Sequence, residues 1–187
     1  MGLHQEASIE RPDQSVGDRH LTFWTLYILD KANLLCTGQP CFLPSYDCGA
    51  PFPAPNSAGD MSHVIFMGRI KLANIQEEIY QRLYTVEGSR KGSLTRLEHV
   101  DQLTVCLEDW RLQFSSILQL GRTSNESLTT PARSVDLSYA YLTSCILVQR
   151  CNTQSDEMRT RLLDYCRRAL SLITEKTLST SSFVTTK

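Results

Sequence analysis

The chain has 187 residues, of which 19 are Lys or Arg and 20 are Asp or Glu, so its formal net charge at pH 7 is −1. A chain of this length fits one domain and can bury roughly 70% of the surface that its unfolded form exposes. Because the sequence lacks the clustered excess of Lys and Arg that neutralises phosphates, we do not expect this chain to bind nucleic acid directly.

The first predicted element is a helix over 18–36, which follows a polar segment, 1–17, that we expect to be loose. Asp18 is suited to cap this helix, because its carboxylate accepts hydrogen bonds from the amides of the first turn. Residues 21–29 place apolar and aromatic groups around almost the whole circumference, which is typical of a helix buried on most of its sides.

Asp30 follows this apolar run directly. An unpaired buried carboxylate costs several kcal/mol, so Asp30 must be hydrogen-bonded or ion-paired. We favour a structural role, in which Asp30 locks the helix to the following loop through Arg150 or an amide of residues 38–42. Direct contact with a ligand is the alternative.

A long proline-rich loop and four further helices are predicted next. The loop runs from Cys36 to Asp60, which hold five of the seven prolines and three of the nine glycines. The helices are predicted over 61–87, 94–119, 134–151 and 155–176, and a Ser- and Thr-rich tail over 178–187 is expected to be disordered. The expected fold class is therefore all-α, an irregular bundle of about five main helices with a long proline-rich loop.

The helix over 61–87 is predicted to separate its apolar and polar residues. Its apolar face holds Ile65, Leu72, Ile75, Ile79 and Leu83, whereas Gln76, Glu77, Gln81 and Arg82 lie mostly off that face. Gly88 is predicted to end this helix. The helix over 134–151 is apolar nearly all round, which predicts a central position in the bundle.

Seven cysteines without a signal-like N-terminal segment indicate a reducing compartment and thiols outside disulfides. Three of them, Cys36, Cys41 and Cys48, lie in the loop with His63 beyond, but the Cys-x2-Cys spacing of zinc sites is absent and no metal is expected. No nucleophile-base arrangement or phosphate loop is recognisable, so we favour a protein that is not an enzyme and needs no cofactor. No stretch approaches the ~18 uncharged apolar residues of a membrane span, and no membrane partner is expected.

The aromatic residues offer the best candidate for a ligand site. Phe23, Trp24, Tyr27, Tyr139 and Tyr141 either line a small-molecule pocket or belong to the core, and an aromatic stripe is more often core. We favour the core interpretation. The candidate ligand-binding residues, should a pocket exist, are Phe23, Trp24, Tyr27, Asp30 and Tyr139.

A series of motifs in the first third of the chain supports a family assignment. In order, they are Arg19, Phe23-Trp24, Tyr27, Leu29-Asp30-Lys31, Gly38-Gln39-Pro40, Asp47 and Pro51-Phe52-Pro53. Weaker matches follow at Leu72-Ala73-Asn74-Ile75, Leu107-Glu108-Asp109-Trp110, Leu137-Ser138-Tyr139 and 163–170. This order resembles the fungal-specific transcription factor domain, the middle homology region of zinc binuclear-cluster regulators, and we expect such a domain over 18–177.

The resemblance implies the regulatory part of a nuclear transcription regulator, which binds a small-molecule effector or a transcriptional partner protein. Nothing in the chain resembles the family's zinc cluster, so it is expected to lack its own DNA-binding domain. Two alternatives stay open. One is a stand-alone copy recruited as an enzyme or metabolite-binding protein in a biosynthetic pathway, in the cytoplasm, and the other is a non-functional fragment.

The first six residues, 1–6, resemble the family's Leu-Gly-Leu-His-Arg element, which normally ends a helix packed in the same domain. Since the initiator methionine falls there, we expect the domain to be truncated at its N-terminal side. The helix that shelters Phe23, Trp24 and Tyr27 would then be missing. These aromatic side chains are therefore expected to form an exposed apolar patch.

Overall fold

The computed structural model describes residues 16–55, 59–120, 129–152 and 155–182, and these residues form helices and loops without a strand. The all-α prediction is confirmed. The longer helices are α1 (Val16–Thr37), α2 (Met61–Ile79), α4 (Ser93–Gln113), α6 (Thr129–Gln149) and α7 (Asp156–Ser182), with short helices α3 (Val86–Arg90) and α5 (Ser115–Leu120) between them. The remaining elements are a 3₁₀ turn, η2 (Ser45–Asp47), and a π-helical turn, η3 (Tyr80–Tyr84), that continues α2.

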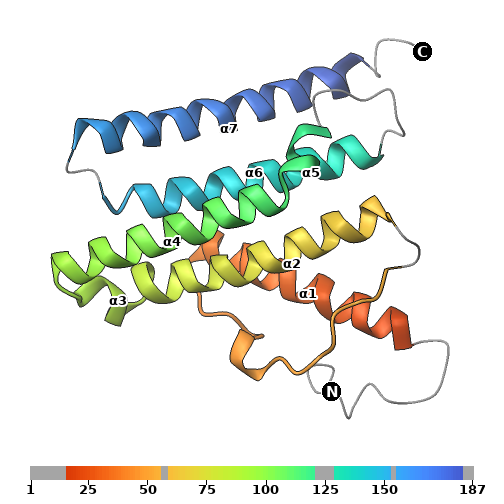
Figure 1. Cartoon of the computed structure of the whole chain (residues 1–187), viewed down its shortest axis with the longest axis horizontal. Helices are drawn as coiled ribbons and strands as arrows, with labels where there is room; N and C mark the ends of the chain where they lie inside the picture. The colour runs from red at the N-terminus through yellow and green to blue at the C-terminus, as the bar shows by residue number, and fades with distance from the viewer. Residues whose placement is uncertain (1–15, 56–58, 121–128, 153–154, 183–187) are drawn as a thin grey trace.

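The helices form a bundle in which α1 and α7 lie on opposite sides, as Figure 1 shows. Helix α2 packs against α1, α4 and α6, whereas α7 packs on α6. The main core lies between α2, α4, α5 and α6 and includes Leu72, Leu103, Ile117 and Leu137, all almost fully buried. Helix α6 is therefore central, as its apolar composition predicts.

Two predicted helices are divided in the structure. The helix predicted over 61–87 becomes π-helical after Ile79 and stops at Thr85, whose extended backbone and hydroxyl cap α3 through the amide of Gly88. A β-carbon on Gly88 would lie 2.6 Å from the carbonyl oxygen of Arg82, so this close turn requires glycine. The helix predicted over 94–119 is interrupted at Phe114, which separates α4 from α5.

The helix ends also differ from the prediction. Helix α6 begins five residues earlier than predicted, at Thr129, and α7 continues to Ser182, into the segment expected to be disordered. The loose segment predicted over 1–17 falls almost entirely outside the described residues, as does the end of the tail from residue 183. Between α1 and α2, the proline-rich loop is present as predicted, and its described residues, 38–55 and 59–60, contain one short turn, η2.

Helix α2 is buried on two faces rather than one. Ile65, Leu72 and Ile79 point into the main core, and Ile70 and Ala73 pack against α1 in a second cluster. The prediction that Gln76 and Glu77 lie off the buried face is wrong, because both side chains are buried. The Gln76 amide donates to the Ser144 hydroxyl at 3.2 Å, and Glu77 faces α1, where its carboxylate pairs with Lys31 at 3.2 Å.

Candidate functional site

A fully buried lysine lies where α1, α2 and the proline-rich loop meet. The Lys31 side chain has 0% exposure, and its ammonium group lies 3.1 Å from an oxygen of Asp30 and 3.2 Å from an oxygen of Glu77. It also donates to the carbonyl of Leu43 and lies 4.5 Å from the ring centroid of Tyr27. The cation is thus shared between two carboxylates, a carbonyl and an aromatic ring, which compensates for the water it has lost.

The two carboxylates fasten the loop to the helices. Asp30 accepts hydrogen bonds from the amides of Phe42 and Leu43 at 3.0 and 3.1 Å. Glu77 accepts from the amide of Ser45 through both oxygens, at 3.2 and 3.1 Å. We refer to Asp30, Lys31 and Glu77 as the ionic lock. The expected role of Asp30 is therefore present, with amides of the loop as partners, whereas Arg150 packs over the ring of Tyr84 instead.

The environment of Lys31 keeps the lysine charged. Burial by itself disfavours the ammonium form, but the hydrogen bond to Asp30 and the charge of Glu77 outweigh that effect and raise the pKa of Lys31 above its ordinary value. Burial and the nearby Glu77 raise the pKa of Tyr27, so its phenol stays neutral in the folded protein. The lock is a structural device in which the two carboxylates share one cation and also accept hydrogen bonds from loop amides, and it positions the loop.

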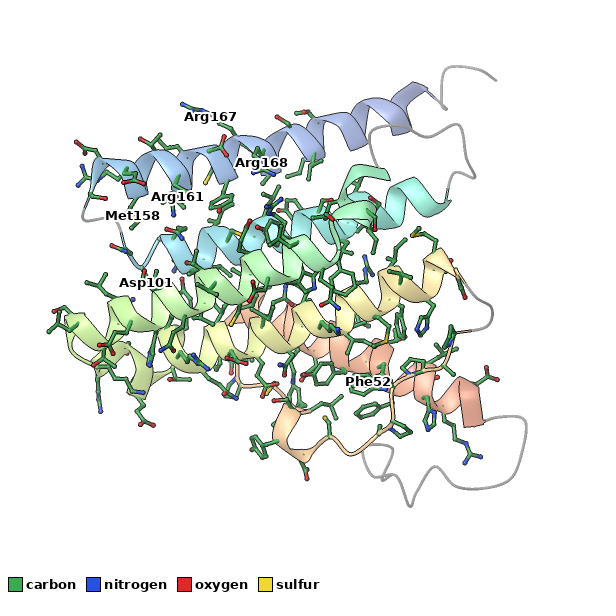
Figure 2. The ribbon with its side chains drawn as sticks, viewed as in Figure 1. Phe52, Asp101, Met158, Arg161, Arg167 and Arg168 are labelled. Carbon is green, nitrogen blue, oxygen red and sulfur yellow. The ribbon has the colours of Figure 1, made fainter. Side chains whose placement is uncertain are left out.

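The aromatic residues of α1 are buried by that loop and by α2. Phe23, Trp24 and Tyr27 are only 1%, 5% and 2% exposed, so the expected exposed aromatic patch is absent. The Trp24 indole donates to the carbonyl of Pro51 at 2.9 Å, and its ring stacks with Phe52 at 4.9 Å between centroids. Figure 2 shows Phe52 on the loop beside α1. The prediction failed because the loop itself covers these side chains.

The exposed apolar residues of α1 lie on its other side. They are Leu21, Leu26 and Leu29, which are between 45% and 59% exposed. Positions 23, 27, 31 and 34 are buried and follow a helical spacing of three and four residues, so α1 turns one face inward and one outward. The prediction of a helix buried on most sides is therefore wrong for α1.

An open cleft of ≈ 530 Å³ lies between the loop, α2 and α4. Its apolar lining comes from Trp24, Tyr27, Phe52, Ile70, Ile75 and Trp110, and its polar lining comes from Ser45, Cys48, Lys71, Asn74, Cys106, Asp109 and Gln113. Small-molecule sites in proteins are concave, largely apolar and of comparable volume, with a few polar groups that orient the ligand. We call this feature the aromatic cleft, and it is the candidate site of the molecule.

The structure separates the five candidate ligand-binding residues. Trp24 and Tyr27 line the aromatic cleft, Phe23 packs in the core beside it, and Asp30 is engaged in the ionic lock. Tyr139 lies on α6, is 42% exposed and is not part of the lining of this cleft. Tyr141, the fifth aromatic residue considered, is in the main core and stacks on Trp110.

The residues that sequence reasoning missed come mostly from α2 and α4. Lys71, Asn74, Cys106 and Asp109 form the polar part of the cleft, and no motif in the sequence singled them out for binding. Within the described residues, no group of three or more His, Cys, Asp or Glu side chains is arranged to hold a metal ion. All seven cysteines lie in the described part of the chain and carry free thiols.

Comparison with known proteins points to one functional class. The chain is 28% identical to "Transcription factor oryO" of Aspergillus oryzae over 87% of its own length and 20% of that protein. It is 26% identical to an "ABC-transporter-regulating transcription factor" of Aspergillus fumigatus, over 91% of the chain and 20% of the relative. The relatives of this chain are fungal transcription regulators. An uncharacterized transcriptional regulatory protein of Schizosaccharomyces pombe is 24% identical over 92% of the chain and 30% of its own length.

These relatives are much longer than the chain, which spans about a fifth of the length of the first two. No family model matches the chain. No solved structure matches it either. In the parts of the chain that the structure describes, no helix combines the length and apolar character needed to cross a membrane.

Proposed function

We propose that this chain is the regulatory part of a fungal transcription regulator and that it senses a small-molecule effector in the aromatic cleft. The observation that carries this proposal is the similarity to transcription regulators along about nine-tenths of the chain. The domain is then a fungal-specific transcription factor domain acting in the nucleus. With a net charge of −1, this segment regulates without itself contacting DNA.

The aromatic cleft is the best-supported place for the effector because it connects three separate parts of the chain. Its walls come from α1 and the loop, from α2, and from α4, so a bound molecule would tie these elements together. The loop is held mainly by the ionic lock and by the Trp24 contacts, which lie directly beside the cleft. An effector that binds one arrangement of the loop more tightly than another therefore shifts the equilibrium toward that arrangement. The size of the shift is set by the difference between the two binding free energies.

We expect ligands of the cleft to raise the melting temperature of the purified chain in a thermal-shift screen of metabolites, because a ligand that binds only the folded state stabilises it. Asn74 is exposed and lines the cleft, so Asn74→Trp should fill the site and abolish the shift. Asn33 is exposed on the outer side of α1, away from the cleft, and Asn33→Trp is the matched control that should retain it. Equal shifts in both variants would place the ligand elsewhere.

A metabolite-binding protein outside transcription is the alternative that the same cleft supports. Thermal shifts alone do not separate it from a regulator, because both bind a small molecule. The distinction requires a transcriptional readout.

A further inference from the structure

The turn between α3 and α4 carries a short basic motif. Arg90 and Lys91 lie three and two residues before Ser93, and Leu94 follows it directly. Basophilic protein kinases select serines in this context, because carboxylates of the kinase bind basic side chains before the acceptor and an apolar pocket takes the residue after it. Figure 1 shows the turn at one end of the bundle. The motif thus predicts a phosphate acceptor there.

The structure leaves this motif accessible. Residues 89–94 are all exposed, Leu94 at 76%. Lys91 and Gly92 have extended backbones, with ψ of 146° and 158°. A β-carbon on Gly92 would meet no atom within 4 Å beyond its chain neighbours, so the space around the turn is open. In the part of the chain that the structure describes, neither Arg90 nor Lys91 forms an ion pair, so both charges are available to a partner.

A kinase binds its acceptor segment in an extended form, so the first turn of α4, which begins at Ser93, must open locally. The cap residue of α4 is Gly92, which offers no side chain to the amides of that turn. A helix end without a side-chain cap opens at a small free-energy cost. The Ser93 hydroxyl can therefore reach a kinase while the rest of α4 stays folded.

The same helix end accommodates the phosphate once it is attached. The first amides of α4 lack a side-chain acceptor, and the N-terminus of a helix carries a partial positive charge. A phosphate on Ser93, the first residue of α4, adds a charge of about −1.5 to −2 and three acceptor oxygens at that place. Arg96 lies three residues further along, on the same side of the helix. These donors stabilise the phosphorylated helix end.

We propose that Ser93 is a phosphorylation site for a basophilic serine/threonine kinase and that its phosphate stabilises the N-terminus of α4. In the reaction, the Ser93 oxygen forms a bond to the γ-phosphorus of ATP, and the bond from that phosphorus to the bridging oxygen of ADP breaks. ADP leaves with the electron pair of the broken bond. The hydroxyl proton passes to a carboxylate of the kinase and then to water, and nothing is oxidised or reduced.

This inference goes beyond the proposed function, because the site is remote from the aromatic cleft. Cys106 is the lining residue on α4 that is nearest to Ser93 in sequence, and positions 93 and 106 are thirteen residues apart, about 20 Å along a helix. Ser93→Ala should therefore keep the thermal shift that a ligand of the cleft produces. Failure of either proposal leaves the other standing.

The test uses the full chain, ATP and the catalytic subunit of cAMP-dependent protein kinase, a basophilic enzyme, as the probe. Peptide mass spectrometry locates the phosphate and measures its rate of attachment, and we expect Ser93 to be the main site. Ser171 is an internal control, because Arg168 precedes it by three residues. It lies within the 27-residue helix α7, and its hydroxyl donates to the carbonyl of Arg167 at 3.0 Å, so it should stay unmodified.

Two variants and one stability measurement make the result specific. Arg90→Gln should lower kcat/KM for Ser93 by about tenfold or more, and tenfold corresponds to about 1.4 kcal/mol. Arg167→Gln makes the same change at an exposed position of α7 and should leave the rate at Ser93 unchanged. The phosphorylated chain should melt about 1–4 °C above the unmodified chain. Ser93→Ala, treated with the same enzyme and ATP, should show no such rise.

An unmodified Ser93, under conditions in which the enzyme phosphorylates a standard basic peptide, would overturn the proposal. Equal rates in Arg90→Gln and Arg167→Gln would also overturn it, as would a main site at Ser171, because the motif would then not direct the kinase. A phosphorylated chain that melts at or below the temperature of the unmodified chain would contradict the stabilisation of α4.

Discussion

Replacing Lys31 by Met is expected to lower the free energy of unfolding by about 3–5 kcal/mol, because it leaves Asp30 and Glu77 buried without their cation. Urea denaturation followed by circular dichroism measures this loss of stability. A Lys31→Met variant that no longer unfolds cooperatively, because it is already unfolded, would agree with the same prediction. Lys71→Met is the matched control, since Lys71 is exposed and its removal should change stability by no more than about 0.5 kcal/mol.

The double variant Lys31→Met/Glu77→Gln sharpens the interpretation. If the penalty of Lys31→Met comes from uncompensated carboxylates, removing one of these charges should recover part of the stability, and the two substitutions should not be additive. A Lys31→Met variant as stable as Lys71→Met would contradict the assignment of the ionic lock.

Trp24→Ala is expected to cost about 3–5 kcal/mol, the range typical of a buried tryptophan replaced by alanine. The substitution removes the stack with Phe52 and the hydrogen bond to the carbonyl of Pro51, which together hold the loop against α1. Thermal or urea unfolding measures the effect, and faster chymotrypsin cleavage after Phe42 or Tyr46, which both lie on the loop, would report the loosened loop. Leu29→Ala, on the same helix but 59% exposed, should be nearly neutral. Similar small effects for both variants would mean that the loop does not cover Trp24 in solution.

The number of main helices and their order were predictable because the apolar positions recur every three to four residues over long segments. The two interruptions within predicted helices were not, and local chemistry explains both. Thr85 and Gly88 form a turn that depends on a close backbone approach, and Phe114 leaves the helix where its ring packs against Gly68 of α2. The spacing of apolar residues along the sequence carries no information about such tertiary contacts.

The ionic lock was predicted in part. Because Asp30 follows an apolar run, its carboxylate was expected to need a partner. In the structure, amides of the loop donate hydrogen bonds to it. Lys31 and Glu77 were missed as buried residues because their charge suggested exposed positions. Their spacing carried a signal, however, since Lys31 lies four residues after Tyr27, and Glu77 lies four after Ala73, on the inward faces of α1 and α2. A charged residue on an otherwise apolar stripe should be considered for a buried ion pair.

The aromatic cleft was predictable only through Trp24 and Tyr27. Its other lining residues come from the loop, α2 and α4, and they meet only because these elements pack at particular angles. The resemblance drawn from the Arg19-to-Pro53 motifs agrees with the functional class of the relatives. The same motifs gave no information about the facing wall on α4, where Cys106 and Trp110 lie.

The regulatory claim is tested most directly by placing the chain between a heterologous DNA-binding domain and an activation region, with a reporter gene in yeast. A compound that stabilises the purified chain through the cleft should change reporter transcription in a dose-dependent manner. The Asn74→Trp fusion should lose this response at equal protein level, and the Asn33→Trp fusion should keep it. Binding to the cleft without any change in transcription, or a response that Asn74→Trp leaves intact, would contradict the account.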